Sequence, residues 1–218
     1  MRNITQNERG RSMIEMLGVL AIIGVLTVGG FALISKMSNA HRANVVIDEI
    51  GVLANKTRMV FHEFVEDNTG EGEVITTSPG TEHNMAKYVS DAKSYPEGLE
   101  YIESANDKYF EDSNDVRFEI MHLRSPKKID YFMLKISQLS DNLCMAVAQS
   151  TWGSPSINGY VGICAGDGCS YSTLIPTNES SSSQNLTNIA KGGAKLTLDG
   201  AADACTSETD NVVYLTFR

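Results

Sequence analysis

The sequence predicts an α+β protein in which one long N-terminal helix packs on a head built around an antiparallel sheet. Three observations support this prediction. Residues 16–35 form an uncharged, largely apolar run, and apolar residues then recur at helical spacing to about residue 66. Short strand-like segments separated by turn residues fill the rest of the chain. We therefore expect two helix halves, 11–35 and 36–66, followed by a globular head over 67–218.

Composition and charge narrow the class of protein. The chain has 218 residues, of which 42% are hydrophobic and 21% charged, so a folded core is expected. Residues 1–42 hold five basic and two acidic residues, whereas residues 43–218 hold 13 basic and 25 acidic ones. A nucleic-acid surface needs a basic patch, so the acidic head argues against DNA or RNA as a partner.

The first helix half is predicted to cross a membrane. The twenty uncharged residues 16–35 would span roughly 30 Å as a helix, which matches the hydrocarbon core of a bilayer. Arg2, Arg9 and Arg11 precede the run and favour a cytoplasmic N-terminus. A cleaved secretory signal peptide fits less well, because its apolar region is usually only about 7–15 residues long. An uncleaved signal anchor stays open.

The second helix half is predicted to be amphipathic. It should end before the polar residues Asp67 and Asn68 and the nearby Gly70. A helix over residues 12–66 would be about 80 Å long. Its apolar stripe, which we expect to lie on the head, consists of Ala43, Ile47, Ile50, Leu53, Ala54, Phe61 and Phe64.

The head is predicted to alternate short strands with two further helices. Helical patterns cover residues 84–94 and 139–149, and the polar segment 104–115 is expected to be an exposed loop. Further loops are expected at 71–80 and in the serine-rich segment 177–185. The predicted strands are 116–123, 129–136, 160–164, 171–175 and 211–217.

Glu15 is the most unusual residue of the N-terminal region, because it lies among apolar neighbours. A carboxylate at such a position is costly and suggests a function with a specific partner. If the chain were cut after Gly10, the new α-amino group would be on Arg11, four residues from Glu15. The amine and the carboxylate could then pair within one subunit or between neighbours.

The stretch from Gly10 to Leu17, followed by about twenty apolar residues, resembles the class III signal of type IV pilins and pseudopilins. The resemblance implies a leader over residues 1–10 and the pilin fold. It also implies that Gly10 is the cleavage-site glycine, Arg11 the N-methylated first residue and Glu15 the assembly glutamate. Arg11 departs from the usual Phe, Met or Leu, and Ala32 stands where the family often has proline.

The resemblance implies a structural subunit of a type IV pilus-like filament, with a type IVb-like major pilin favoured. Its partners would be further copies of itself, the prepilin peptidase and the pilus assembly machinery of the inner membrane. The subunit would wait in the inner membrane and then move to the pilus on the cell surface. A minor pseudopilin of a type II secretion or DNA-uptake system is the alternative. A signal-anchored periplasmic enzyme or receptor is a third possibility, from another class.

Four cysteines follow the membrane segment, and disulfides are expected if that side is periplasmic. Three pairings are possible. We favour Cys144 with Cys205 and Cys164 with Cys169, the second pair closing a small loop; Cys144 with Cys164 and Cys169 with Cys205 is the runner-up. Pilins commonly carry a disulfide that ties the C-terminal region to the head, which the Cys144–Cys205 pair resembles. A zinc site is the alternative, although the spacings match no zinc-finger or zinc-ribbon pattern.

The common catalytic motifs are missing from the sequence. It has no G-x-S-x-G, H-E-x-x-H, Walker A or G-x-G-x-x-G motif. The four histidines, His41, His62, His83 and His122, are too far apart to form a metal-binding motif. We therefore expect no enzymatic activity, no metal and no cofactor.

Overall fold

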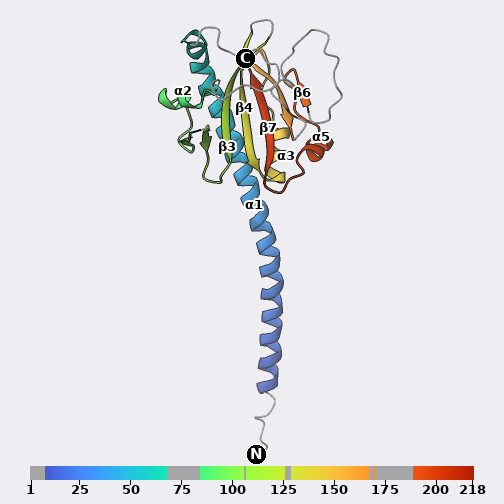
Figure 1. The fold of residues 1–218 in the computed structure, drawn as a ribbon. Coiled ribbons are helices and arrows are strands. Elements are labelled where there is room, and N and C mark those ends of the chain that lie inside the picture. Colours follow the sequence, from blue (N-terminus) through green and yellow to red (C-terminus); the bar gives the residue numbers. More distant parts are fainter. Residues whose placement is uncertain (1–7, 68–83, 106, 126–128, 167–168, 170–188) are drawn as a thin grey trace, which may run out of the picture. The chain divides into compact units, whose positions relative to one another are not determined.

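The structure is a computed structural model of the chain (Figure 1). It describes residues 8–67, 84–105, 107–125, 129–166, 169 and 189–218. The chain divides into two compact units, Met1–Arg42 and Ala43–Arg218. Helix α1 (Glu8–Asp67) contributes residues to both units, which are described separately below.

Helix α1 is 60 residues long, and its bounds extend the helix predicted over residues 12–66 by four residues at the start and one at the end. Its sequence contains no proline, so nothing removes a backbone donor or clashes with the preceding turn. The N-terminal unit therefore consists, over its described residues, of helix alone. The second unit contains the last part of α1 and the whole head.

Within the second unit, α1 packs through one face. Val46, Ile50 and Leu53 are fully buried, at the three- and four-residue spacing that places side chains on one side of a helix. Further along, Phe61 lies 5.2 Å from the ring of Phe132 on the sheet. This is the amphipathic packing that the sequence predicts, and it places the core between helix and sheet.

The sheet has seven strands among the described residues, in the order β1-β2-β3-β4-β7-β5-β6, and every neighbouring pair is antiparallel. The predicted α+β architecture, a long helix on an antiparallel sheet, is confirmed. The last strand lies between β4 and β5, so the C-terminus closes the sheet at its centre. The strands are β1 (Glu100–Glu103), β2 (Lys108–Glu111), β3 (Arg117–Arg124), β4 (Asp130–Leu139), β5 (Tyr160–Ala165), β6 (Ile189–Lys191) and β7 (Asn211–Phe217).

The central strands are buried on both faces. Ile120 of β3 pairs with Leu134 of β4, and both belong to the core that includes α1. A second apolar cluster contains Leu123, Tyr131, Met133 and Cys164. Successive residues of a strand point to opposite faces, so alternate positions of β3 and β4 supply the two clusters.

Three short helices complete the described head: α2 (Ala86–Asp91), α3 (Asp141–Gln149) and α5 (Leu198–Ala204). Ser140 caps α3 by accepting a hydrogen bond from the backbone N–H of Leu143. Thr197 caps α5 in the same way, through the N–H of Gly200. In Figure 1, α2 and α5 lie at opposite edges of the sheet.

The prediction of an exposed loop at 104–115 was wrong over part of its length, since β2 occupies Lys108–Glu111. The charged residues Lys108 and Glu111 at its two ends suggest an exposed segment, but Phe110 between them is fully buried. Strands β1 and β6 and helix α5 were not predicted at all. All three are short, and their sequences carry weak periodicity.

The predicted helix at 139–149 begins two residues later than expected. Leu139 is the last residue of β4 and pairs with Asn211, while Ser140 is the cap of the helix. The predicted loops at 71–80 and 177–185 and the predicted strand at 171–175 lie outside the described residues.

Candidate functional site

The predicted assembly residues all lie on the same part of α1. Gly10 and Arg11 are in the helix, although the side chain of Arg11 is outside the described set. Glu15 is exposed and lies four residues after Arg11, which corresponds to a rise of about 6 Å along the helix. The spacing of the two positions is therefore that of one helical turn, as the pairing hypothesis requires. Cleavage, methylation and pairing stay predictions.

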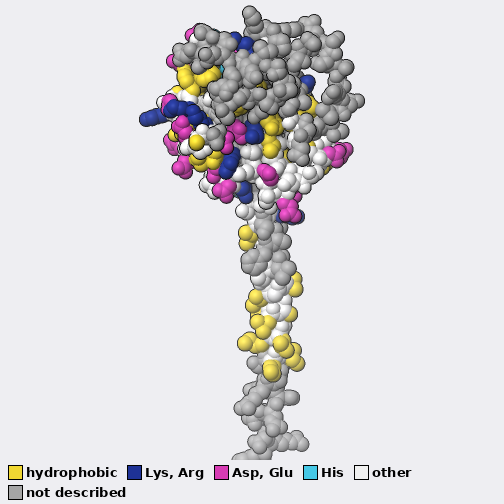
Figure 2. Space-filling model, viewed as in Figure 1, with side chains coloured by type: hydrophobic (Ala, Val, Ile, Leu, Met, Phe, Trp, Pro, Cys, Tyr) yellow, Lys and Arg dark blue, Asp and Glu magenta, His cyan; other side chains and the backbone are white. Residues whose placement is uncertain are grey.

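Directly around Glu15 the helix is hydrophobic on every side. Ten large apolar side chains between residues 13 and 26 are 52% to 76% exposed, and hydrophobic side chains are visible along this part of the helix in Figure 2. Within the described part of the chain, no helix is long and apolar enough to span a membrane. The ten side chains are Met13, Ile14, Met16, Leu17, Val19, Leu20, Ile22, Ile23, Val25 and Leu26.

The second unit contains a groove of about 450 Å³ between α1 and the loop over residues 151–158. Asn44, Asp48 and Asn55 line it from the helix, and Trp152 lines it from the loop. Gly51 also faces the groove, and a Cβ built on it would meet nothing within 4 Å. The groove therefore exists partly because this helical position has no side chain.

The loop beside the groove is held in one conformation by Asn158. Its carboxamide oxygen accepts hydrogen bonds from the backbone N–H of Ser154 at 3.2 Å and of Tyr160 at 3.3 Å, and its amide nitrogen donates to the carbonyl of Trp152. Arg58 of α1 donates to the carbonyl of Ile157 at 3.4 Å. These bonds fix a loop whose Ile157 side chain is 79% exposed.

Glu49 is a partly buried carboxyl group on α1. One of its oxygens is buried without a hydrogen-bond partner among the described residues. Burial, together with repulsion from Asp112 and Asp48, raises its pKa from 4.5 to about 7. Glu49 therefore changes charge in the range where most carboxyl groups are already ionised.

A second ionisable cluster joins β3 to β4. Asp130 accepts two hydrogen bonds from Arg124, at 2.8 and 3.1 Å, and lies 2.8 Å from Nε2 of the buried His122. Burial alone would raise the pKa of Asp130, but the hydrogen bonds from Arg124 and His122 outweigh it and lower the pKa below the usual value. The cluster keeps a carboxylate ionised inside the fold and supports the sheet.

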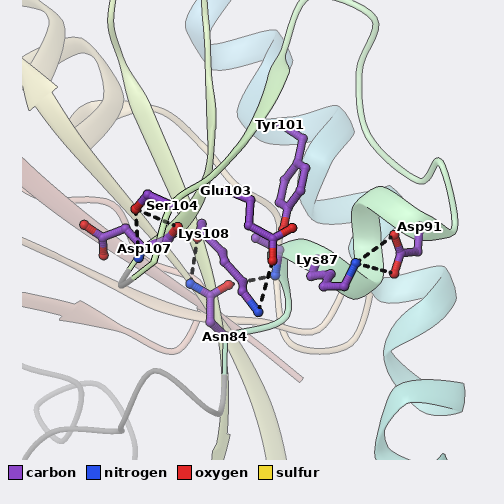
Figure 3. Close-up of polar contacts among 9 residues, drawn as sticks. Asn84, Lys87, Asp91, Tyr101, Glu103, Ser104, Asp107 and Lys108 are labelled. Carbon is purple, nitrogen blue, oxygen red and sulfur yellow. Dashed lines mark hydrogen bonds and ion pairs between the residues drawn. The ribbon is translucent and has the colours of Figure 1, made fainter.

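A third polar cluster lies at the β1 edge of the sheet (Figure 3). The Tyr101 hydroxyl donates to Glu103 at 3.1 Å, and Lys108 lies 3.5 Å from the same carboxylate. Asn84 donates to the carbonyl of Lys108 at 2.7 Å. Partial burial and the neighbouring Glu103 raise the pKa of Tyr101 to about 12. Paired charges on an edge strand discourage pairing with a foreign strand, so we interpret this cluster as protective.

The cysteines form two disulfides, Cys144–Cys205 and Cys164–Cys169. This is the favoured pairing, and the zinc alternative is wrong for these cysteines because a disulfide sulfur is not a thiolate ligand. The first bond joins α3 to the residue that follows α5, and the second closes a short loop after β5. Among the described residues, no group of three His, Cys, Asp or Glu side chains is arranged to hold a metal.

Sequence reasoning missed the groove and the perturbed Glu49. Both depend on which segment far away in the sequence packs beside α1. The local signal available was Gly51, an unusual residue within a helix, flanked on the same face by Asn44, Asp48 and Asn55.

Comparisons with known proteins give two solved structures of similar fold. The type IVb pilin from Salmonella typhi has 13% identity and a TM-score of 0.43, covering 75% of this chain and 95% of that one. TcpA, a type IV pilin from Vibrio cholerae El Tor biotype, has 12% identity and a TM-score of 0.47, covering 79% and 98%. No family model and no curated protein matches the sequence.

Proposed function

We propose that this protein is a structural subunit of a type IV pilus-like filament, cut after Gly10 and polymerised through the N-terminal part of α1. The observation that carries the proposal is the set of ten large apolar side chains exposed on all sides of the helix between residues 13 and 26. They begin three residues after Gly10 and surround Glu15. A helix that is hydrophobic all round requires an apolar environment on every side.

Assembly of many copies provides that environment. Burying a large aliphatic side chain contributes roughly 1.5–3 kcal/mol, so ten of them correspond to a gross gain on the order of 15–30 kcal/mol per subunit. Once the subunit leaves the membrane, helices packed side by side in a fibre would keep this surface out of water. A head-to-tail contact that does not close into a ring continues as a helical filament.

Glu15 gives the assembled helices a defined register. Cleavage after Gly10 would leave a positively charged amine on Arg11, and in the fibre interior this amine pairs with the Glu15 carboxylate of a neighbour. Each charge offsets the desolvation of the other only when the two are paired. A single matched pair among apolar side chains therefore favours one axial stagger over others.

Before assembly, the uncharged run 16–35 holds the subunit in the inner membrane with the basic leader on the cytoplasmic side. The prepilin peptidase then removes residues 1–10 and methylates Arg11, and the assembly machinery of that membrane extracts the subunit. The head is exposed to the periplasm and afterwards on the cell surface. Its two disulfides suit such oxidising compartments.

The test combines N-terminal sequencing with filament yield. We expect the mature chain to begin at Arg11 and Gly10→Asp to keep the leader. Glu15→Ala should be processed yet enter sheared filaments poorly, whereas Glu63→Ala, an exposed glutamate later on the same helix, should assemble normally. A native chain that keeps Met1 would overturn the proposal, and normal filaments from Glu15→Ala would refute the pairing role. Fibres in which this chain is a minor component would favour the pseudopilin alternative.

A further inference from the structure

We propose that the groove between α1 and the 151–158 loop receives the part of α1 that carries Ile34, Lys36 and Met37 from a second copy, with Lys36 paired to Asp48. This contact rests on the proposed filament function. It adds a specific surface on the head and names the segment that fills it.

The groove has the properties of an acceptor for a helix. It is a hollow of about 450 Å³ whose helical wall includes Gly51, so a neighbouring backbone can approach closely. Asn44, Asp48 and Asn55 line it, and all three residues are exposed. Its polar groups are therefore available to a partner.

The edge of the groove carries two exposed apolar side chains. Met59 is 81% exposed and lies one helical turn beyond Asn55, on the same side of α1. Ile157 is 79% exposed and precedes Asn158, which lines the groove and fixes the loop through its hydrogen bonds. Because hydrogen bonds already hold the loop that carries Ile157, little backbone entropy is lost when this loop contacts a partner.

The N-terminal unit offers a segment with complementary chemistry. Ile34 is 64% and Met37 is 74% exposed, and their three-residue spacing places them on one side of the helix. Lys36, between them in sequence, is an exposed cation, whereas the groove contains the exposed carboxylate of Asp48. Lys36 lies about 100° around the helix from Met37. A helix entering the groove would therefore place Met37 against the apolar border and Lys36, beside it, toward Asp48.

Charge also selects this segment over the rest of the exposed apolar helix. Residues 13–27 contain no cation, and their one charged residue, Glu15, would repel Asp48. Opposite charges across an interface mainly determine specificity and register, whereas the apolar contacts supply affinity. A Lys36–Asp48 pair therefore defines which turn of the neighbouring helix enters the groove.

The first test is disulfide cross-linking within assembled filaments. The four native cysteines are all paired, so the introduced cysteines are the only free thiols. We expect Met37→Cys with Gly51→Cys to give a ladder of covalent multimers on non-reducing gels after oxidation. The matched control is Met37→Cys with Glu63→Cys. Glu63 is exposed and lies about 18 Å further along the helix axis from Gly51, so this pair should give no ladder.

The second test is reversal of the proposed pair. Asp48→Lys and Lys36→Asp should each lower filament yield about threefold or more, and the double variant should restore it. Glu97→Lys reverses an exposed carboxylate that does not line the groove and should leave the yield unchanged. Rescue in the double variant is not expected if either substitution acts by impairing folding or membrane insertion.

The outcomes separate the two proposals. Absence of filaments from the unaltered protein would overturn the filament function and this contact with it. Normal filaments without the 37–51 ladder, or without loss of yield in Asp48→Lys, would overturn the groove contact alone. A ladder together with charge-swap rescue would establish it.

Discussion

The two parts of helix α1 both carry leucines, but the surroundings of these leucines are opposite. Leu20, in the N-terminal unit, is 62% exposed, whereas Leu53, in the second unit, is fully buried. Both belong to one proline-free helix of 60 residues. Backbone hydrogen bonding therefore forms the helix in both places, whereas the rest of the chain decides which part becomes core.

This contrast implies that one part of α1 contributes to the stability of the head and the other part to the assembly of subunits. In the second unit the chain supplies its own apolar partners, because strands β3, β4 and β7 cover the buried face of α1. In the N-terminal unit, the exposed apolar side chains need partners from outside the unit. Substitutions in the two parts should therefore change different measurements.

The largest effect on the stability of the head is expected from its long-range disulfide. Replacing Cys144 and Cys205 by alanine releases a loop with a sequence separation of 61 and should cost about 4 kcal/mol in the chain-entropy model. Replacing Cys164 and Cys169, separated by 5, should cost about 2 kcal/mol by the same relation. Urea unfolding of the full chain in detergent measures both. Equal losses would show that loop length does not govern the stabilisation.

The next largest effect compares the two leucines directly. Leu53→Ala removes a fully buried side chain between helix and sheet and should lower the free energy of unfolding by about 3 kcal/mol. Leu20→Ala should change it by less than about 0.5 kcal/mol, because that side chain is exposed in the monomer.

Both leucine variants should then be scored for filament yield. We expect Leu20→Ala to reduce assembly while leaving thermal unfolding of the head unchanged. If Leu20→Ala instead destabilised the isolated subunit as much as Leu53→Ala does, the contrast between the two parts of α1 would be wrong.

The smallest effect concerns Glu49 and depends on pH. Its pKa is raised in the folded state, to about 7 from 4.5, so the folded protein resists ionisation that the unfolded chain undergoes. The free-energy cost of ionising Glu49 in the folded protein therefore develops as pH rises from about 4.5 to 7, and it is complete above pH 7. Glu49→Gln removes it, and the variant should melt higher than the original at pH 8 and equally at pH 4.

The matched control for this measurement is Glu63→Gln, an exposed glutamate on the same helix. This variant should change the melting temperature only slightly, and by the same amount at pH 4 and at pH 8. The effect of Glu49→Gln is expected to be modest, because solvent screens a group that is only partly buried. A melting-temperature difference that is the same at pH 4 and pH 8 would contradict the proposed ionisation.

The local sequence pattern predicted an element correctly where apolar residues recur at a regular spacing along it. The stripe through Ile50, Leu53 and Phe61 predicted the buried face of α1, and the alternating residues of β3 and β4 predicted two central strands. It failed for β2, where only Phe110 signals burial among charged neighbours. A four-residue strand is too short for its own period to be visible, so its pairing partners decide its conformation.

The long helix, the apolar run and the position of Glu15 after Gly10 follow from the amino-acid sequence alone, because they depend on neighbours a few residues apart. The strand order, the groove beside Gly51 and the raised pKa of Glu49 arise instead from the folded arrangement of the chain. Each of these requires segments far apart in the chain to be side by side, as when Trp152 comes to lie opposite Asp48. The physical reason is that packing and electrostatic interactions act through space, whereas hydrophobic periodicity acts along the chain.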